Sequence, residues 1–257
     1  MQETKPLGAQ ISHMLKDRGV DVIFGIPGVH NQEMYRGIEE AGIRHVLARH
    51  EQGAGFMADG YARATGKPGV AYVITGPGLC NIMTPMGQAY SDSVSVLVLS
   101  SCLNETASRR GQLHQMLDQE AAARTVCDWS YQANSAKAAY DLVERALVEF
   151  KTQRPRSKHI QVPIGLLEGQ AISPPRQSTA LAETLATTNM DMTSLALALS
   201  SADKPLFVIG GGAAAAATAL REVVSACGAA CFETYAGRGI IAWDYPLNFG
   251  ATLAGPS

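Results

Sequence analysis

The sequence lacks several features that would place it in a specialised class of protein. Only 17% of its 257 residues are charged and the formal net charge is −2, which excludes the basic bias typical of nucleic-acid-binding proteins. No apolar run is long enough to cross a bilayer, and residues 1–20 lack the apolar core of a secretion signal. The composition therefore predicts a soluble globular protein without a membrane or nucleic-acid partner.

Cysteine is scarce as well, and familiar catalytic motifs are missing. The five cysteines are scattered, and only Cys227 and Cys231 lie close together, as C-x3-C without a second pair. This spacing favours reduced thiols and a cytoplasmic protein over a disulfide or zinc framework. His50 and Glu51 lack the second histidine of H-E-x-x-H, and neither G-x-S-x-G nor G-x-x-x-x-G-K-[ST] occurs. The sequence therefore excludes a zincin site and gives no sign of a serine hydrolase or P-loop enzyme.

Short apolar segments alternate with helical patterns over residues 1–170. The segment VSVLVLS at 94–100 shows no polar alternation, which is typical of a strand buried on both faces. Such strands between helices predict an α/β fold of three layers, with a parallel sheet covered by helices on both faces. We expect strands at 21–26, 44–48, 70–75, 94–100, 129–133 and 159–163, and helices at 6–18, 31–41, 51–65, 79–91 and 135–151.

The character of the sequence changes after the first domain. Residues 171–190 carry Pro, Ser and Thr with little periodicity, which predicts a linker. Residues 191–257 then show a strand, a glycine-rich turn, an alanine-rich helix and another strand. We therefore expect a first domain over 1–170 and the beginning of a second domain over 191–257.

The glycine-rich turn of the second domain suggests an alternative function. Gly210, Gly212 and Ala215 satisfy G-x-G-x-x-G/A, and Glu233 follows at a distance suited to a ribose-binding acid. A nicotinamide-dependent oxidoreductase is therefore one hypothesis. The motif is weak evidence, because a tight turn between a strand and a helix uses glycine for steric reasons alone.

Glycine, proline and polar residues gather after the first four expected strands. The carboxyl ends of parallel strands meet at one edge of a sheet, where ligands of such sheets bind. We therefore expect a site at this edge. The segments concerned are GIPGVHN (25–31), RHEQG (49–53), TGPGLCN (75–81) and SSCLNE (100–105).

Glu51 places a carboxylate at the start of a helix that is rich in small residues. Ala54, Ala58 and Ala62 recur at every fourth position, and so do Gly60 and Ala64. Two strips of this helix therefore lack bulk, so that another backbone can approach closely. The simple alternative is that Glu51 only caps the helix.

Four motifs in this order resemble the pyrimidine-binding domain of thiamine-diphosphate enzymes of the acetolactate synthase and pyruvate decarboxylase superfamily. The motifs are GVDVIFGIPG, RHEQGAGFMADGYARATGKPGV, TGPGLCN and HQMLD. The resemblance implies a flavodoxin-like first domain, followed by the start of a Rossmann-like central domain that binds FAD in some members. GIPGVHNQEMYRG is most similar to acetolactate-synthase-like decarboxylases of longer 2-oxo acids.

The resemblance also implies roles for individual residues. The glutamate that matches Glu51 hydrogen-bonds N1′ of the cofactor's aminopyrimidine and promotes formation of the C2 ylid, which attacks the 2-oxo carbon before CO2 is lost. Gln115 matches an active-site glutamine. His30 and His114 lie where the substrate is expected, although each could be a plain loop residue. The implied cofactor-binding residues are Pro27, Gly28, Glu51, Thr75, Gly76, Pro77, Gly78 and Asn81.

The family binds the diphosphate and magnesium through a carboxyl-terminal domain with a G-D-G…N-N motif, which this sequence does not contain. We therefore expect a fragment that alone turns over no 2-oxo acid. The resemblance implies a homodimer or homotetramer that shares the cofactor site between subunits. It also implies a 2-oxo acid decarboxylase or carboligase, and a catalytically silent domain of the same fold is a further alternative.

Overall fold

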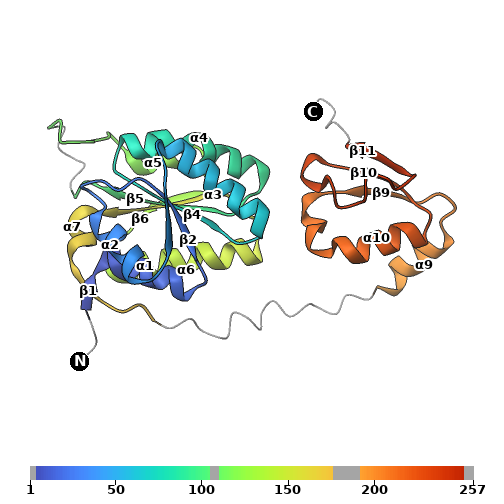
Figure 1. The fold of residues 1–257 in the computed structure, drawn as a ribbon, viewed down its shortest axis with the longest axis horizontal. Helices are drawn as coiled ribbons and strands as arrows, with labels where there is room; N and C mark the ends of the chain where they lie inside the picture. Colours follow the sequence, from blue (N-terminus) through green and yellow to red (C-terminus); the bar gives the residue numbers. More distant parts are fainter. Residues whose placement is uncertain (1–3, 105–109, 176–191, 252–257) are drawn as a thin grey trace. The chain divides into compact units, whose positions relative to one another are not determined.

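A computed structural model describes residues 4–104, 110–175 and 192–251. The chain divides into two compact units, Met1–Leu185 and Ala186–Ser257, which are each described by themselves (Figure 1). Within the described residues, no helix has both the length and the apolar character that crossing a membrane requires.

The first unit is built around a parallel sheet of six strands in the order β3-β2-β4-β5-β7-β6. All six strands that the sequence predicts are present, which confirms the α/β fold. Their bounds are β2 (Val22–Gly25), β3 (Arg44–Leu47), β4 (Gly69–Val73), β5 (Val96–Cys102), β6 (Trp129–Gln132) and β7 (Lys158–Pro163).

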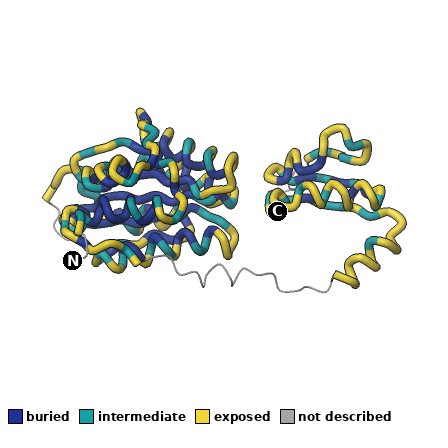
Figure 2. Tube along the Cα trace, turned by 60° about the horizontal axis from the view of Figure 1, so that its bottom comes forward, coloured by how far each residue is buried: buried dark blue, intermediate teal, exposed yellow. Residues whose placement is uncertain are grey.

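Helices cover both faces of this sheet, so the unit has three layers (Figure 1). Along β4, Val70 and Tyr72 are buried in the cluster beneath the first layer of helices, whereas Ala71 and Val73 are buried in the cluster beneath the second. The strands form the dark centre of the burial tube (Figure 2). The first layer holds α1 (Leu7–Asp17), α2 (Gln32–Glu40) and α6 (Ala136–Thr152), and the second holds α3 (Glu51–Thr65), α4 (Pro77–Asp92) and α5 (Gln119–Arg124).

The strand order reverses direction at β2. The chain passes from β2 to its neighbour β3 on one side, and then returns to β4 on the other side of β2. The helix after β2, α2, lies in the first layer and the helix after β4, α4, lies in the second. Loops that leave neighbouring strands toward opposite faces open a crevice between them, and ligands of open α/β sheets bind there. The sheet therefore places a candidate site beside the loops after β2 and β4.

Four short elements were not expected from the sequence. Strand β1 (Thr4–Pro6) pairs antiparallel with β8 (Gln170–Ile172), so residues 171 and 172 belong to the first unit instead of the expected linker. Helices α5 and α7 (Ile164–Glu168) are also short. Elements of three to six residues are too short to show a period, so their pairing becomes visible only in the fold. Residues 176–190 of the expected linker lie outside the described residues.

The alanine strip of α3 packs inside the first unit. Ala54, Ala58 and Ala62 are all buried in the cluster between α3 and the sheet. A Cβ on Gly69 of β4 would lie 2.0 Å from the carbonyl oxygen of Ala58, so the helix and the strand are in backbone contact. The close approach that the small residues predict is therefore made with the chain's own sheet. Gly60, on the second strip, is exposed.

A buried lysine lies where β6 and β7 begin, at the end of the sheet opposite the candidate site. The Lys158 side chain is 1% exposed, and its Nζ lies 2.8 Å from carboxylate oxygens of Asp128 and Glu149. Glu149 also accepts hydrogen bonds from Trp129 Nε1 at 2.7 Å and from Arg145 Nε at 2.6 Å. Buried charges are tolerated when they are paired in this way. The cluster therefore stabilises the edge of the sheet that faces away from the candidate site.

This cluster predicts a pH dependence of stability. Burial raises the pKa of Glu149, but hydrogen bonds from Lys158, Trp129 and Arg145 outweigh burial and lower the pKa from 4.5 to about 2. A carboxyl group whose pKa is depressed by folding contributes stability above its unfolded pKa and loses it as pH falls. We therefore expect the free energy of unfolding to decrease from about pH 4.5 to about pH 2. Urea denaturation at pH 7 and pH 3 measures this decrease.

The variant Glu149→Gln isolates the contribution of this carboxylate. It should lose about 1.5–3 kcal/mol at pH 7, the range for hydrogen bonds to charged groups. It should also show a smaller loss of stability between pH 7 and pH 3. Glu168→Gln, which changes an exposed glutamate, is the control. An unchanged pH dependence in Glu149→Gln would contradict the assignment.

The second unit contains a parallel sheet of three strands in the order β11-β10-β9. Its small core contains Ile209, Val224 and Cys231. The expected sequence of strand, glycine-rich turn, helix and strand is present. Its elements are α9 (Thr193–Ser201), β9 (Leu206–Ile209), η1 (Gly211–Ala216), α10 (Ala217–Ala226), β10 (Ala230–Glu233), η2 (Tyr235–Gly237) and β11 (Asn248–Ala251).

Candidate active site

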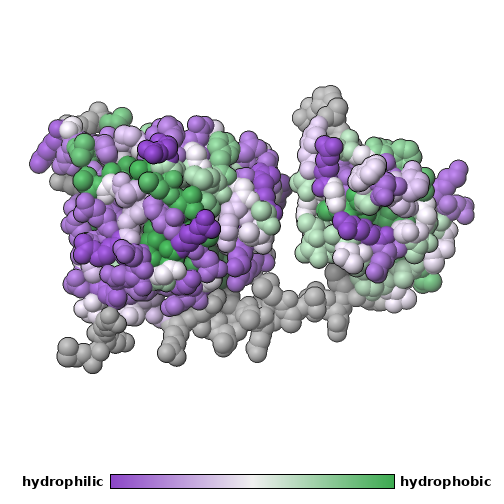
Figure 3. All heavy atoms as spheres, viewed as in Figure 1, coloured by the Kyte–Doolittle hydropathy of each residue, from purple (hydrophilic) through white to green (hydrophobic). Residues whose placement is uncertain are grey.

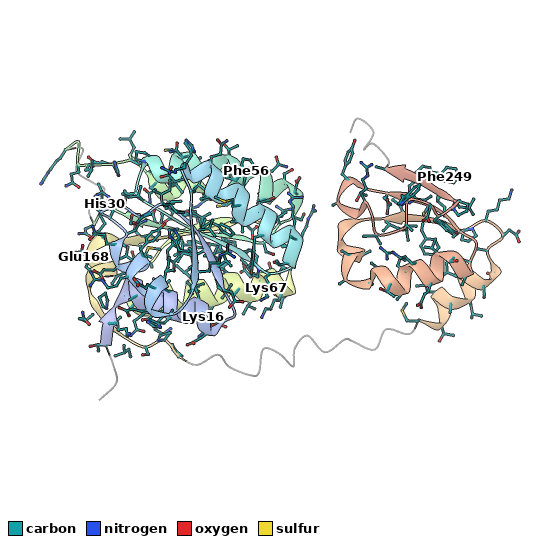
Figure 4. The ribbon with its side chains drawn as sticks, viewed as in Figure 1. Lys16, His30, Phe56, Lys67, Glu168 and Phe249 are labelled. Carbon is teal, nitrogen blue, oxygen red and sulfur yellow. The ribbon has the colours of Figure 1, made fainter. Side chains whose placement is uncertain are left out.

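The loops after β2, β3, β4 and β5 meet at one edge of the first unit. His30, from the loop after β2, and Lys67, which precedes β4, are labelled on opposite sides of this unit (Figure 4). The rings of His30 and His114 are in edge contact, with centroids 5.5 Å apart, so the loops after β2 and β5 touch. The edge at which the sequence predicts a site is therefore assembled in the structure.

Glu51 is the first residue of α3, but it does not cap the helix. The N-cap is His50, whose Nδ1 accepts a hydrogen bond from the backbone N–H of Gln52 at 3.1 Å. The Glu51 carboxylate instead accepts a hydrogen bond from Asn81 Nδ2 of α4 at 2.8 Å. The capping alternative is therefore wrong. The contact joins two residues that the resemblance assigns to cofactor binding, and it orients the carboxylate from a neighbouring helix.

Glycines lie where side chains would crowd this edge. A Cβ on Gly78 would lie 2.8 Å from Ile74 and 3.5 Å from Oε1 of Glu51. A Cβ on Gly28 would lie 2.4 Å from Cδ1 of Ile74. Ile74, which follows β4, therefore packs against both the loop after β2 and the first turn of α4. Glycine at position 78 therefore lets the first turn of α4 approach Ile74 and Glu51 closely, and Gly78 is itself buried.

Gly76 is held in a conformation that favours glycine. Its φ is 65° and its ψ is −105°, and a Cβ would lie 2.2 Å from the carbonyl oxygen of His114. Its backbone N–H donates to Oε1 of Gln119 at 2.8 Å. The preceding residue, Thr75, donates through its N–H and its hydroxyl to Oγ of Ser101, at 3.1 and 2.9 Å. The loop after β4 is therefore anchored by residues at and after the end of β5.

The two histidines form the part of this edge where the sequence predicts substrate. Burial lowers the pKa of His30, and the nearby His114 lowers it further. The Nδ1 atoms of both rings are buried and have no hydrogen-bond partner among the residues that the structure describes. His114 itself has a positive φ of 62°, which is uncommon for a residue other than glycine. The structure thus brings the two residues together, and it holds His30 toward its neutral form.

The remaining residues of the expected site lie in the same loops. Gln115 follows His114, and its N–H donates to the carbonyl oxygen of Gln112 at 3.0 Å. Pro77 is the first residue of α4, a position that proline favours because its missing N–H needs no partner there. Pro27 is exposed next to Gly28. The sequence predictions for these residues stay predictions, because no contact shown here assigns them a chemical role.

Sequence reasoning missed three residues that shape this edge: His50, Ser101 and Gln119. Histidine is not among the favoured N-cap residues, so no cap was expected at His50. Ser101 and Gln119 are fully or almost fully buried polar residues. No sequence pattern marks these two residues. Buried polar side chains need hydrogen-bond partners, and here the partners come from distant parts of the chain, so the role of the two residues is visible only in the fold.

A polar cavity opens beside α5 instead of beside Glu51. Its volume is about 360 Å³, and Gln119 is the lining residue that also bonds the loop after β4. Glu51 is not among its lining residues, so this cavity is not the site built around that carboxylate. The lining consists of Leu117, Asp118, Gln119, Glu120, Ala121, Arg124, Gln132 and Gln161.

The nicotinamide alternative is not supported. Glu233, the expected ribose-binding acid, is 3% exposed, and its carboxylate accepts the backbone N–H of Ile241 at 2.9 Å. Its other oxygen lies 3.4 Å from the N–H of Gly239. The carboxylate therefore binds its own chain. The turn at Gly210 leads into a 3₁₀ helix, which suits a tight connection.

Comparison with known families identifies both units. Residues 6–122 match the family model "Thiamine pyrophosphate enzyme, N-terminal TPP binding domain". Residues 192–255 match "Thiamine pyrophosphate enzyme, central domain". Together the two matches cover more than half of the chain, and each lies on the unit where the sequence predicted that domain.

Comparison with individual proteins agrees with the family assignment. A probable 2-ketoarginine decarboxylase of Pseudomonas aeruginosa is 43% identical over 98% of this chain and 46% of its own length. The acetolactate synthase large subunit of Lactococcus lactis is 34% identical over 77% of this chain and 35% of its own. The isozyme 2 large subunit of Escherichia coli acetolactate synthase is 30% identical over 95% and 44%. The chain thus spans less than half the length of these relatives.

Proposed function

Because this chain belongs to the thiamine pyrophosphate-dependent enzymes, we propose that it forms the amino-terminal part of a 2-oxo acid decarboxylase or carboligase. The observation that carries the proposal is the position of Glu51. Its carboxylate lies at the carboxyl edge of the sheet, is held by Asn81, and lies beside Gly78, where a Cβ would be 3.5 Å from Oε1 of Glu51. When bound, thiamine diphosphate supplies the carbanion-stabilising chemistry that breaks the bond to the carboxylate of a 2-oxo acid.

The residues of this edge fit the aminopyrimidine of that cofactor. Gly28 and Gly78 both pack against Ile74 so closely that a Cβ on either residue would clash with it. Glu51 would hold a proton at N1′ of the ring, because a carboxyl group can give and take one proton along a fixed hydrogen bond. Asn81 would keep the carboxylate in place for that exchange. The pairing of Glu51 with N1′ is what the family resemblance implies, and the hydrogen bond from Asn81 supports it.

We propose magnesium as a second requirement, because the diphosphate of the cofactor is anionic and Mg²⁺ commonly bridges protein carboxylates and phosphates. No group of three or more potential metal ligands occurs among the residues that the structure describes. The proposal of Mg²⁺ therefore rests on the family resemblance. The proposal of FAD, which binds the central domain in some members of the family, rests on the same resemblance.

His30 and His114 are proposed to contact the substrate. They lie on the same edge as Glu51, and one relative is named as a probable 2-ketoarginine decarboxylase. Burial lowers the pKa of His30, and its neutral imidazole offers one donor and one acceptor for a polar group of the substrate. We therefore expect the protein expressed at full length to release CO2 from 2-ketoarginine, and only when thiamine diphosphate is present.

The measurement is CO2 release with 2-ketoarginine and with pyruvate, each with and without cofactor and Mg²⁺. Acetolactate formation from pyruvate would favour carboligation over simple decarboxylation. Absence of cofactor-dependent turnover with 2-oxo acids of every chain length would contradict the proposed activity. We also propose a cytoplasmic location, which is consistent with the five unpaired cysteines.

We propose that the chain forms at least a homodimer. The outer face of α3 carries Phe56, which is 43% exposed, and Gly60. A Cβ added to Gly60 would point into open space, with no neighbouring atom within 4 Å. Figure 3 shows an apolar patch among polar side chains on the visible face of the first unit. Exposed apolar surface of this kind often marks an interface. We expect light scattering at micromolar concentration to give a mass of two chains or more.

The variant Phe56→Ser tests which face associates. It should weaken the dimer, whereas Ile172→Ser, which changes a similarly exposed apolar residue on β8, should not. A monomeric wild-type protein at micromolar concentration would count against the proposed association.

A further inference from the structure

Gln119 links the loop that carries the cofactor-binding glycines to the interior of the sheet. Its side chain is almost fully buried, at 3% exposure, between the ends of β4, β5 and β7. We propose that Gln119 is a positioning residue, which sets the hydrogen bond between Glu51 and Asn81 by fixing Gly76 at the start of α4. The role in catalysis rests on the proposed function, whereas the structural role of Gln119 does not.

The orientation of the Gln119 amide is determined by its neighbours. Oε1 accepts the N–H of Gly76 at 2.8 Å, and Nε2 donates to the carbonyl oxygen of Ser101 at 2.9 Å. Nε2 also donates to Oε1 of Gln161 at 3.0 Å. Gln161 in turn donates from its Nε2 to Oε1 of Gln132 at 2.8 Å. A flipped amide would direct an NH2 group at the N–H of Gly76. Only one orientation therefore satisfies these groups.

The groups that contact the Gln119 amide directly are uncharged. Nε2 of Gln119 lies 3.1 Å from Oγ of Ser100, which contacts Nε2 of His159 at 2.8 Å. Nδ1 of His159 contacts Oγ of Ser130 at 2.7 Å, and complete burial lowers the pKa of His159 to about 3. The charged groups that contact this network are Glu120, whose carboxylate accepts the N–H of Gln132 at 3.0 Å, and Arg124, whose Nη2 lies 3.4 Å from the carbonyl oxygen of Ser130. Because the groups that contact Gln119 directly are uncharged, its effect on the site is geometric.

The position of Gly76 is transmitted to Glu51 through the first turn of α4. The carbonyl oxygen of Gly76 accepts the N–H of Cys80 at 2.9 Å, which begins the helix. Asn81 follows Cys80 and donates to Glu51. A displacement of Gly76 therefore shifts Asn81 relative to the carboxylate. The hydrogen bonds of Thr75 to Ser101 hold the strand end, but Gln119 holds the residue from which the helix starts.

The test compares Gln119→Leu with Gln119→Glu. Leucine removes all hydrogen bonds at similar volume, so the Gly76 amide should lose its protection from hydrogen exchange, measured by NMR on the cofactor-free chain labelled with [15N]glycine. In the full-length protein with thiamine diphosphate, hydrogen–deuterium exchange at cofactor C2 should slow by about 10–100-fold, as expected for a displacement of about 1 Å. Gln10→Leu is the matched control, because Gln10 is also buried and its Nε2 donates to the carbonyl oxygen of Ala171 at 3.2 Å.

The Gln119→Glu variant should restore function in a pH-dependent way. A protonated carboxyl group can accept from Gly76 and donate to Ser101, as the amide does. Its ionised form would face the oxygens of Ser101 and Gln161, and burial raises the pKa of such a group. C2 exchange should therefore be close to wild type at low pH and fall as pH rises. The Gln119→Leu variant should be slow at every pH.

Two results would overturn the positioning role. One is a Gly76 amide that keeps its protection in Gln119→Leu, and the other is C2 exchange within about twofold of wild type after that protection is lost. If Gln119→Leu does not fold, a C2 exchange rate in Gln119→Glu that follows the wild-type pH profile would overturn it instead. A wild-type protein that binds no thiamine diphosphate would refute the proposed function, and the Gly76 measurement would still decide whether Gln119 holds the loop.

Discussion

Glu51→Gln in the full-length protein should lower 2-oxo acid turnover by about 10²–10⁴, the usual contribution of a positioned acid–base group. Glutamine keeps the volume of the side chain and its oxygen can still accept from Asn81, but it cannot exchange a proton with N1′. Hydrogen–deuterium exchange at cofactor C2 should slow in parallel, because this step precedes the chemistry of the substrate. Both rates are measured on the same protein with thiamine diphosphate and Mg²⁺ in excess.

Thermal melting separates this role from a structural one. The helix is capped by His50, so the melting temperature of Glu51→Gln should stay close to that of the wild type. Glu39→Gln, which changes an exposed glutamate of α2, is the control for loss of a negative charge. A Glu51→Gln protein that melts normally and keeps near-normal C2 exchange would contradict the assigned role.

Gly69→Ala should destabilise the first unit by about 3 kcal/mol or more, at the upper end of the range for overpacking a buried site. A Cβ at this position would lie 2.0 Å from the carbonyl oxygen of Ala58, and both atoms belong to regular elements that cannot move independently. Relief requires α3 to move away from β4, which would also displace Glu51. Urea denaturation followed by circular dichroism measures the loss.

Gly87→Ala is the matched control for this change. Gly87 lies in α4, in the same layer, and a Cβ there would meet its nearest atom, on Val126, at 3.7 Å, an ordinary contact. Alanine in a helix interior is favoured over glycine by up to about 1 kcal/mol, so this variant should be as stable as the wild type or more stable. If Gly69→Ala is as stable as Gly87→Ala, then α3 does not contact β4 as described.

Local sequence was sufficient for the elements that have a clear period. The apolar run at 94–100 predicted a buried strand, and β5 at Val96–Cys102 is buried throughout. The repeating small residues at 51–65 predicted a helix that approaches another backbone, and α3 has these bounds. Both predictions succeed because a single face of regular structure determines which side chains are buried. The partner of the small residues was not predictable, since a helix pattern does not say what covers it.

The sequence by itself determined the class of fold, the chain order of the loops and the identity of Glu51 as the carboxylate at the helix start. These depend on residues close together in the chain, and the four ordered motifs extend them to a family. Only the tertiary structure decided that Asn81 holds Glu51, that His50 caps α3, and that the His30 and His114 rings touch. It also decided the place of Gln119, whose partners Gly76 and Gln161 lie 43 and 42 residues away. The physical reason is that a buried polar side chain is defined by its hydrogen-bond partners, and a parallel sheet brings those partners together from separate strands.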